Sequence, residues 1–462
     1  MSWHTVLTAM LPENLLLAGI VALLLLTIVG GRARAALPLA VLAVGAATAA
    51  AAWLSISGYS AAAFSGQFSV TPGSLAAKAI VLALAVPVLL LSRDDFVGSE
   101  FHALLLSSLY GVCLLLSADS FLTLFLGLEV MSLPVYVLVL LAFRRPQSAE
   151  AALKYLVLSG TASATFLMGV SFLYGATGSL EISTFAAALV SSGLMATAAV
   201  VLVVVAFFLK AAVVPFHAWA PDAYEAASIP VTAYMATIIK AGVLLAIVRL
   251  FDIAPLSRPM VDLLAILPLA SIVWGNLAAI RQTSFRRMMA YSSIAHAGYL
   301  FYAFLGAGPG RFQAVVFYLL AYGVMNLLAF ASIPSGADDA SRDRLDRLKG
   351  LFQREPYAAL MLGIAMLSLA GIPPFPGFVA KFLIFRNVME AGYTLYAVLG
   401  LIGSYLGIYF YLRVIQYAFM SPGELVADER AAVSRAALGA SVLCLAPVVV
   451  LSVFPGWVIG WF

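Results

Sequence analysis

Residues 207–215 read FFLKAAVVP and place Lys210 inside an apolar stretch that is long enough to cross a bilayer. Glu129, Lys240 and Lys381 occupy the same kind of position in three other apolar stretches. A charge at the bilayer centre costs roughly 2.5–3.5 kcal/mol on insertion scales, and such residues are rare and mark ion pathways. Four of them in four spans indicate a path for ions, and the proton is the ion that these side chains suit best.

The composition is that of an integral membrane protein. Of 462 residues, 64% are hydrophobic and only 10% are charged, whereas soluble domains are about 45–50% apolar and about 25% charged. The formal charge of +4 comes from thinly spread basic residues, which are better explained as topology signals than as a nucleic-acid surface. We therefore expect a lipid bilayer as the surroundings and no nucleic-acid partner.

Motifs for ATP hydrolysis and for redox centres are absent from the sequence. There is no phosphate-binding glycine loop, CxxC cluster, HExxH, nucleophile elbow or haem-ligand pattern. The two cysteines, Cys113 and Cys444, lie in apolar stretches without the spacing of a metal site or disulfide framework, so they are predicted core residues. The energy for ion movement must therefore come from other proteins.

The apolar runs predict an all-α polytopic fold, a single integral membrane domain over 1–462 with about 14 spans. These runs cover 11–29, 36–54, 73–92, 101–118, 120–143, 152–175, 194–216, 229–250, 260–280, 288–306, 312–333, 357–390, 394–418 and 436–454. The run 357–390 is too long for one straight crossing and contains Pro373, Pro374 and Pro376. It should be two half-helices, whose break must lie inside protein or beside a wet cavity.

The basic residues between spans predict the orientation. Five follow even-numbered spans or lie on that side: Lys78, Arg249, Arg258, Arg311 and Arg386. Seventeen lie after odd-numbered spans: Arg32, Arg34, Arg93, Arg144, Arg145, Lys154, Arg281, Arg286, Arg287, Arg342, Arg344, Arg347, Lys349, Arg354, Arg413, Arg430 and Arg435. Because cytoplasmic loops carry the excess of lysine and arginine, both termini are expected outside the cytoplasm.

Lys210 and Glu129 are the natural partners among the membrane charges. Burial in an apolar medium disfavours an ammonium, and a nearby carboxylate stabilises it. A pair that opens and closes would therefore switch the lysine between holding and releasing a proton. The alternatives are a static buried ion pair, or a lysine whose amine reaches the membrane surface.

Lys240, Lys381 and two histidines complete the candidates. Lys240 lies near the middle of its span, and Lys381 follows the proline break, where freed carbonyls and water suit a proton exit. His296 could pass protons between its two ring nitrogens or be a hydrogen-bonded structural residue. His217 has aromatic and proline neighbours, which favour a structural role at a helix end.

These residues lie in motifs that resemble those of the antiporter-like (Mrp-type) membrane subunits of respiratory complex I, and most closely the N-type subunits. In chain order the motifs are FLGLE (125–129), SLP (132–134), YVL (136–138), LKY (153–155), FLK (208–210), VPFHAWAPDAYE (214–225), PVTA (230–233), RMMAYSSIAHAGY (287–299) and SLAGIPP (368–374), followed by GF (377–378) and Lys381. The lysine in the twelfth span fits an N-type or L-type subunit, and the short chain excludes the L-type.

The resemblance implies two inverted five-helix repeats, 101–250 for spans 4–8 and 260–418 for spans 9–13, with spans 7 and 12 broken. It also implies a proton relay in which Glu129 pairs with Lys210, Lys240 is the central residue and Lys381 the terminal one. His296 is a further possible relay residue, from the chemistry of its ring and not from the resemblance. The chain would be a subunit of a proton-translocating NADH-quinone oxidoreductase and would carry no redox centre itself.

The resemblance also implies the surroundings of the chain. NADH, FMN, Fe–S clusters and quinone would bind in partner subunits. An M-like antiporter subunit and small K- and J-like subunits would be the membrane neighbours. The location would be the bacterial inner membrane, with both termini periplasmic.

Two other functions fit the same residues. A subunit of a multi-chain Na⁺/H⁺ antiporter or of a membrane-bound hydrogenase would show sodium-driven exchange without dependence on NADH. A structural scaffold would use the buried charges as fixed ion pairs between subunits. Its charge-removing variants would assemble poorly yet pump normally per assembled complex.

Overall fold

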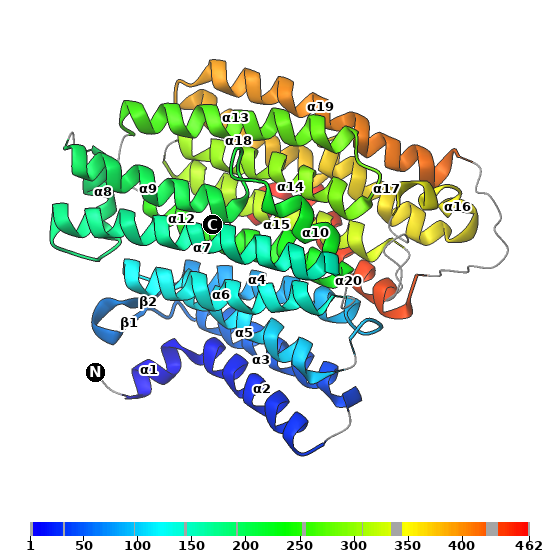
Figure 1. The fold of residues 1–462 in the computed structure, drawn as a ribbon, viewed down its shortest axis with the longest axis horizontal. Coiled ribbons are helices and arrows are strands. Elements are labelled where there is room, and N and C mark those ends of the chain that lie inside the picture. Colours follow the sequence, from blue (N-terminus) through cyan, green and yellow to red (C-terminus); the bar gives the residue numbers. More distant parts are fainter. Residues whose placement is uncertain are drawn as a thin grey trace.

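The computed structural model describes residues 3–30, 33–96, 98–142, 146–190, 193–251, 256–306, 308–333, 344–421 and 433–460. The described chain is almost entirely helical (Figure 1). A two-stranded antiparallel hairpin, β1 (Ala61–Ala63) and β2 (Phe68–Val70), is the one sheet within these ranges. The predicted all-helical polytopic architecture is therefore confirmed.

The first half of the chain runs from α1 to α12. Its helices are α1 (Trp3–Ala9), α2 (Leu11–Ile28), α3 (Ala36–Ile56), α4 (Pro72–Leu91), α5 (Ser99–Leu116), α6 (Phe121–Leu141), α7 (Pro146–Thr177), α8 (Ser183–Val190), α9 (Leu194–Ala211), α10 (Trp219–Ala226), α11 (Ile229–Tyr234) and α12 (Lys240–Val248). Between α11 and α12 the helix is continuous through a π-helical turn, η3 (Met235–Ile239).

The second half runs from α13 to α21. Its helices are α13 (Arg258–Ile280), α14 (Phe285–Tyr302), α15 (Pro309–Ala331), α16 (Leu351–Arg354), α17 (Pro356–Ala370), α18 (Pro376–Glu390), α19 (Thr394–Phe419), α20 (Arg435–Val453) and α21 (Pro455–Ile459). The 3₁₀ turn η6 (Leu345–Leu348) precedes α16 in the connection between α15 and α17.

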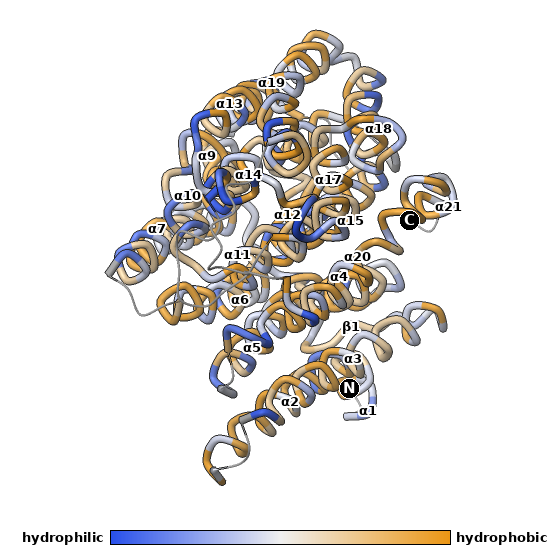
Figure 2. The backbone as a smooth tube through the Cα atoms, turned by 90° about the vertical axis from the view of Figure 1, so that its right-hand side faces the viewer, coloured by the Kyte–Doolittle hydropathy of each residue, from blue (hydrophilic) through white to orange (hydrophobic). Residues whose placement is uncertain are grey.

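The predicted spans correspond to helices of the structure in order. Twelve helices in the described ranges are long and apolar enough to cross a membrane. The other two predicted spans are α14, whose first turn holds Arg286 and Arg287, and the interrupted α17–α18. The protein thus has twelve to fourteen apolar helices, and Figure 2 shows hydrophobic residues along nearly all of them.

Two helices end within the bundle in the same way. Ala212 after α9 and Gly371 after α17 are left-handed, with φ of 60° and 83°. The amides that follow bond back to the last turn, Val213 N to Phe208 O at 2.9 Å and Ile372 N to Leu367 O at 3.1 Å. Each break also contains a cis proline, at Val214-Pro215 and at Pro373-Pro374.

The helices form layers, with α2 and α3 at one edge in Figure 1 and α13 and α19 at the other. The span through α11, η3 and α12 is buried along its length, and α15 is buried along nearly all of its length. The first of these two central spans carries Lys240, and the second carries Tyr322, whose ring faces the lysine amine. The lysine of α12 therefore lies in the protein interior.

The structure corrects one part of the orientation argument. Lys78 is not a loop residue on the outer side, because it lies in α4 and is fully buried. Its amine donates to Glu13 Oε1 on α2 at 2.6 Å. The ratio of seventeen to five becomes seventeen to four, which leaves the predicted orientation unchanged. Five of the seventeen lie outside the described residues: Arg32, Arg144, Arg145, Arg342 and Arg430.

Candidate proton pathway

Lys210 and Glu129 form the ion pair that the sequence predicted. Lys210 is in the last turn of α9, where the helix end favours a cation. Its Nζ donates to Glu129 Oε1 of α6 at 3.2 Å and to Ser159 Oγ of α7 at 2.8 Å. The lysine side chain is 5% exposed and that of Glu129 is 23% exposed, so the carboxylate is the outer member of the pair.

Hydroxyl groups surround this ion pair. Ser132 Oγ accepts a further hydrogen bond from Lys210 Nζ at 3.3 Å, and the Ser163 hydroxyl donates to the Glu129 carboxylate. Removing one member of a buried pair leaves the other charge uncompensated, which costs about 3–5 kcal/mol. These serines supply neutral hydrogen bonds to each charge in addition to the ion pair itself.

Lys240 has no carboxylate partner among the described residues. It is the first residue of α12, directly after the π-helical turn, and is 5% exposed. Its amine donates to both the carbonyl and the hydroxyl oxygen of Ser293 on α14. The amine also lies 5.8 Å from the centre of the Tyr322 ring. Among the described residues, Lys240 is thus bound by a serine and an aromatic face.

Lys381 is bound at the second helix break. From α18 its amine reaches back to the last carbonyls of α17, Leu369 O at 3.2 Å and Ala370 O at 3.0 Å. It also donates to Ser404 Oγ at 3.0 Å and lies 5.1 Å from the centre of the Tyr299 ring. The carbonyls freed at a helix end therefore take the place of a counter-ion.

His296 lies between the two unpaired lysines. Its Nδ1 shares a hydrogen bond of 2.7 Å with the Tyr318 hydroxyl, and its Nε2 shares one of 3.1 Å with the Tyr411 hydroxyl. The ring packs against Tyr322, which faces Lys240, and against Tyr299, which faces Lys381. Both ring nitrogens are hydrogen-bonded, so the imidazole can accept on one side and donate on the other.

The spacing on α14 explains how this group is assembled. Ser293, His296 and Tyr299 are three residues apart and therefore share one helix face. Ser293 binds Lys240, and Tyr299 faces Lys381. The helix α14 thus contacts both Lys240, the central candidate, and Lys381, the terminal one. In the described chain, no hydrogen bond joins Lys210 directly to Lys240.

His217 lies apart from this chain of groups. It follows the break after α9, and its Nε2 accepts a hydrogen bond from Trp274 Nε1 of α13 at 3.0 Å. The backbone amide of Val214, in the same break, donates to Ser271 Oγ of α13 at 2.7 Å. These two hydrogen bonds fasten the break after α9 to α13, which fits the structural role at a helix end that was predicted for His217.

Sequence reasoning missed the second buried ion pair, Glu13 with Lys78. Both side chains are fully buried, and the amine also lies 4.9 Å from the Phe68 ring centre. Each residue lies within two turns of its helix start, so each looked like an end residue. Their shared signal is a charge in each of two apolar spans, the first and the third in chain order.

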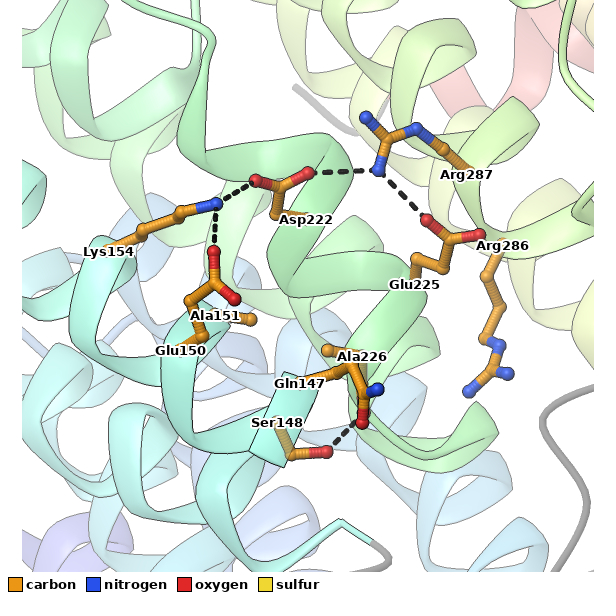
Figure 3. Close-up of a pocket in the computed structure, with 10 residues that line it drawn as sticks. All are labelled: Gln147, Ser148, Glu150, Ala151, Lys154, Asp222, Glu225, Ala226, Arg286 and Arg287. Carbon is orange, nitrogen blue, oxygen red and sulfur yellow. Dashed lines mark hydrogen bonds and ion pairs between the residues drawn. The ribbon is translucent and has the colours of Figure 1, made fainter. Parts of the chain in front are cut away.

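An open pocket of about 480 Å³ lies at the end of α10, between α7 and α14 (Figure 3). Lys154 is bonded to Glu150 at 2.7 Å and to Asp222 at 2.9 Å, and Arg287 bridges Asp222 at 2.9 Å and Glu225 at 2.8 Å. Lys154 and Arg287 belong to the excess of basic residues after odd-numbered spans, so the pocket is on the side predicted to be cytoplasmic. Within the described ranges, no group of three or more His, Cys, Asp or Glu could hold a metal ion.

Comparisons with known proteins show the family of the chain. The family described as NADH:quinone oxidoreductase/Mrp antiporter, transmembrane, matches residues 118–407. NADH-quinone oxidoreductase subunit N of Pelobacter propionicus is 41% identical over 424 residues, which is 91% of this chain and 90% of that protein. The chain belongs to the subunit N family of NADH-quinone oxidoreductase.

Solved structures separate this family from others with the same fold. A chain of respiratory complex I from Thermus thermophilus has a TM-score of 0.84 at 35% identity, over 97% of this chain and 98% of that one. A chain of the Mrp complex from Dietzia has a TM-score of 0.86 but only 22% identity, over 98% and 96%. The Mrp likeness shows the fold alone, since one fold hosts several functions. As a subunit N family member, the protein is a proton-translocating membrane subunit of complex I.

Proposed function

We propose that Glu129, Lys210, Lys240, His296 and Lys381 carry the protons that this subunit moves. The observation that supports this most directly is the contact series from Lys240 to Lys381. It runs over Ser293 and Tyr322 to His296, and then over Tyr299 to Lys381. Each step joins groups that can bind a proton or stabilise a cation by hydrogen bonds or an aromatic face.

The Glu129–Lys210 pair is the element that opens and closes. Opening removes the carboxylate that stabilises the ammonium, so the lysine releases its proton toward Lys240 and then Lys381. Quinone reduction in neighbouring subunits supplies the electrostatic change. Moving one charge against the membrane potential costs about 2.3 kcal/mol per 100 mV. A change of a few kcal/mol in pair stability is therefore large enough to control the step.

The proposal includes an internal repeat and the surroundings of the subunit. The matching ends of α9 and α17 support inverted repeats over 101–250 and 260–418. An M-like antiporter subunit and small K- and J-like subunits are the proposed neighbours. NADH, FMN, Fe–S clusters and quinone would be bound in the rest of the complex. The proposed location is the bacterial inner membrane with both termini periplasmic.

The experiment measures NADH-driven acidification of inverted membrane vesicles carrying Lys210→Ala, normalised to assembled complex. We expect pumping and NADH–quinone activity to fall together while assembly is intact, because a coupled carrier limits both. Lys349→Ala is the matched control, since this lysine is exposed in the connection before α16.

Two results would contradict the proposal. Normal acidification per assembled Lys210→Ala complex, with a loss of assembly only, would assign the pair to a scaffold. Sodium-driven exchange that persists without NADH would favour an antiporter subunit.

A further inference from the structure

A buried asparagine on α13 bonds to two neighbouring helices close to the terminal lysine. Asn276 is only 2% exposed. Its side-chain nitrogen donates to the Tyr299 hydroxyl of α14 at 3.1 Å and to Gly403 O of α19 at 3.0 Å. A side-chain amide nitrogen carries two N–H groups, so both donors are used. One side chain therefore ties three helices together.

The two partners of Asn276 lead to two groups that contact Lys381. Tyr299 presents its ring to the lysine amine, which lies 5.1 Å from the ring centre. Gly403 is followed on α19 by Ser404, whose hydroxyl accepts a hydrogen bond from the same amine at 3.0 Å. The contacts form a closed loop, which runs from Asn276 through Tyr299, Lys381, Ser404 and Gly403 back to Asn276.

The helix α19 fixes the direction in which the Asn276 amide faces. If the amide were turned over, its oxygen would face the Gly403 carbonyl, and two acceptors cannot form a hydrogen bond. The helix also lies directly against the amide, because a Cβ added at Gly407 would meet Asn276 Oδ1 at 2.6 Å. Asn276 therefore has a single favourable orientation, in which one N–H points at Tyr299.

The position of the Tyr299 ring relative to Lys381 leaves little tolerance. A cation is attracted to an aromatic face when it lies within about 6 Å of the ring centre. At 5.1 Å the lysine amine is inside this range, so a ring displacement of about 1 Å is enough to weaken the contact. The hydrogen bond from Asn276 to the Tyr299 hydroxyl opposes such a displacement.

We propose that Asn276 is a positioning residue for proton transfer at Lys381. The inference rests on the proposed function, because it requires that Lys381 carries protons. The helix α19 holds the lysine amine through Ser404 and the tyrosine ring through Gly403 and Asn276, so amine and ring are fixed to the same helical turn. The ring then stabilises the ammonium form of a lysine that no carboxylate contacts among the described residues.

The test uses Asn276→Leu in the assembled complex, which keeps a similar volume and removes both N–H groups. Proton uptake and NADH–quinone turnover are measured in H₂O and in D₂O, per assembled complex. We expect pumping to fall about tenfold, as the loss of one desolvated cation–aromatic contact would cause. The H₂O/D₂O rate ratio should rise, because proton transfer at Lys381 becomes rate-limiting. An asparagine that only joined helices would change the amount of assembled complex and neither of these values.

Asn14→Leu is the matched control. Asn14 is a partly buried residue of α2, and its side-chain amide donates to Leu7 O of α1 at 3.3 Å. The helix α2 lies at the opposite edge of the molecule from α13 and α19 (Figure 1). The control makes the same change from amide to leucine, and it should pump at the normal rate with the normal isotope ratio.

Tyr299→Phe tests the same hydrogen bond from its other end. This variant keeps the ring and removes the hydroxyl that accepts from Asn276. We expect a similar fall in pumping and a similar rise in the isotope ratio. The double variant Asn276→Leu with Tyr299→Phe should be no slower than the slower single variant, because both changes break one bond. Tyr299→Phe alone decides the matter if Asn276→Leu does not assemble.

Lys381→Met separates this inference from the proposed function. Wild-type pumping and isotope ratio in assembled Asn276→Leu or Tyr299→Phe would overturn the positioning role, and so would losses that multiply in the double variant. If Lys381→Met is inactive in the same experiment, the proposed function stands. Normal pumping by assembled Lys381→Met would overturn the proposed function itself.

Discussion

Glu129 shows how a single side chain can control a membrane charge. It is the partly exposed member of its ion pair and receives hydrogen bonds from both Lys210 and Ser163. Replacing its carboxylate by an amide keeps the size and the acceptor oxygen while removing the charge. The Glu129→Gln variant thus isolates the electrostatic contribution of the pair.

We expect Glu129→Gln to slow proton pumping by about tenfold or more, which corresponds to about 1.4 kcal/mol on one step. The measurement is NADH-driven acidification of inverted vesicles, with the amount of assembled complex determined on native gels. Glu181→Gln is the control, because Glu181 is an exposed residue between α7 and α8. Equal pumping by both variants would remove Glu129 from the pathway.

The sequence was informative at this scale wherever a charge lay deep in an apolar run. Lys240 could be selected because it lies near the middle of its span, and Lys210 and Lys381 because each lies beside a proline within an apolar run. The partners of Lys240 could not be predicted, because a serine and a tyrosine in an apolar helix are ordinary residues. Lys78 was misplaced because six residues from a helix start is compatible with either a loop-side or a buried amine.

Helix packing sets the position of the groups on α14. Gly298, between His296 and Tyr299, lies so close to α13 that an added Cβ would meet Pro268 O at 2.6 Å. Backbone atoms cannot move aside as the end of a flexible side chain can. The glycine therefore allows α14 to approach α13 closely enough to place Tyr299 beside Lys381.

We expect Gly298→Ala to destabilise the subunit by about 1–3 kcal/mol, the usual effect of overpacking. The loss should appear as a lower temperature for half-inactivation of NADH–quinone activity in purified complex. Gly45→Ala is the comparison, because a Cβ at this helical position on α3 would meet nothing within 4 Å. If both variants inactivated at the same temperature, the close approach of α13 and α14 would not limit stability.

Element boundaries were predictable where prolines or glycine mark them. The prolines at 373, 374 and 376 predicted the break that Gly371 begins. From apolarity, the seventh span was expected to continue to 216, yet α9 ends at Ala211 because Ala212 adopts a left-handed conformation. Alanine has no preference for the left-handed conformation, so the residue type at position 212 did not predict that α9 ends there. The break itself was expected from the family resemblance and from Pro215, which had suggested a helix end beside His217.

At the scale of the molecule, a buried ion pair joins the first helices to one another. Glu13 of α2 and Lys78 of α4 are fully buried at 2.6 Å, and the β1–β2 hairpin covers the lysine through Phe68. The pair lies outside the proposed pathway from Glu129 to Lys381. Its charges should therefore matter for stability and not for proton movement.

We expect Glu13→Gln to destabilise the subunit by about 3–5 kcal/mol, because it leaves the Lys78 charge buried without its partner. The double variant Glu13→Leu with Lys78→Met should recover most of that loss, since an apolar pair needs no desolvated charge. Thermal inactivation of the purified complex measures both. Pumping that stays lost in a thermally stable double variant would show that the pair has a role in transport.

The two central spans are more apolar than their buried positions in the folded protein require. The helix through Ile229–Phe251 and the helix α15 are as apolar as the more exposed spans, such as α3 and α13, yet they are buried along nearly their whole length. During synthesis, however, each span must leave the translocon and enter the bilayer, where apolar residues are favoured and charged ones are not. The apolar composition of these helices is therefore suited to biogenesis. It restricts how many polar groups the pathway can contain, because each of them, Lys240 included, must enter the bilayer as part of an apolar span.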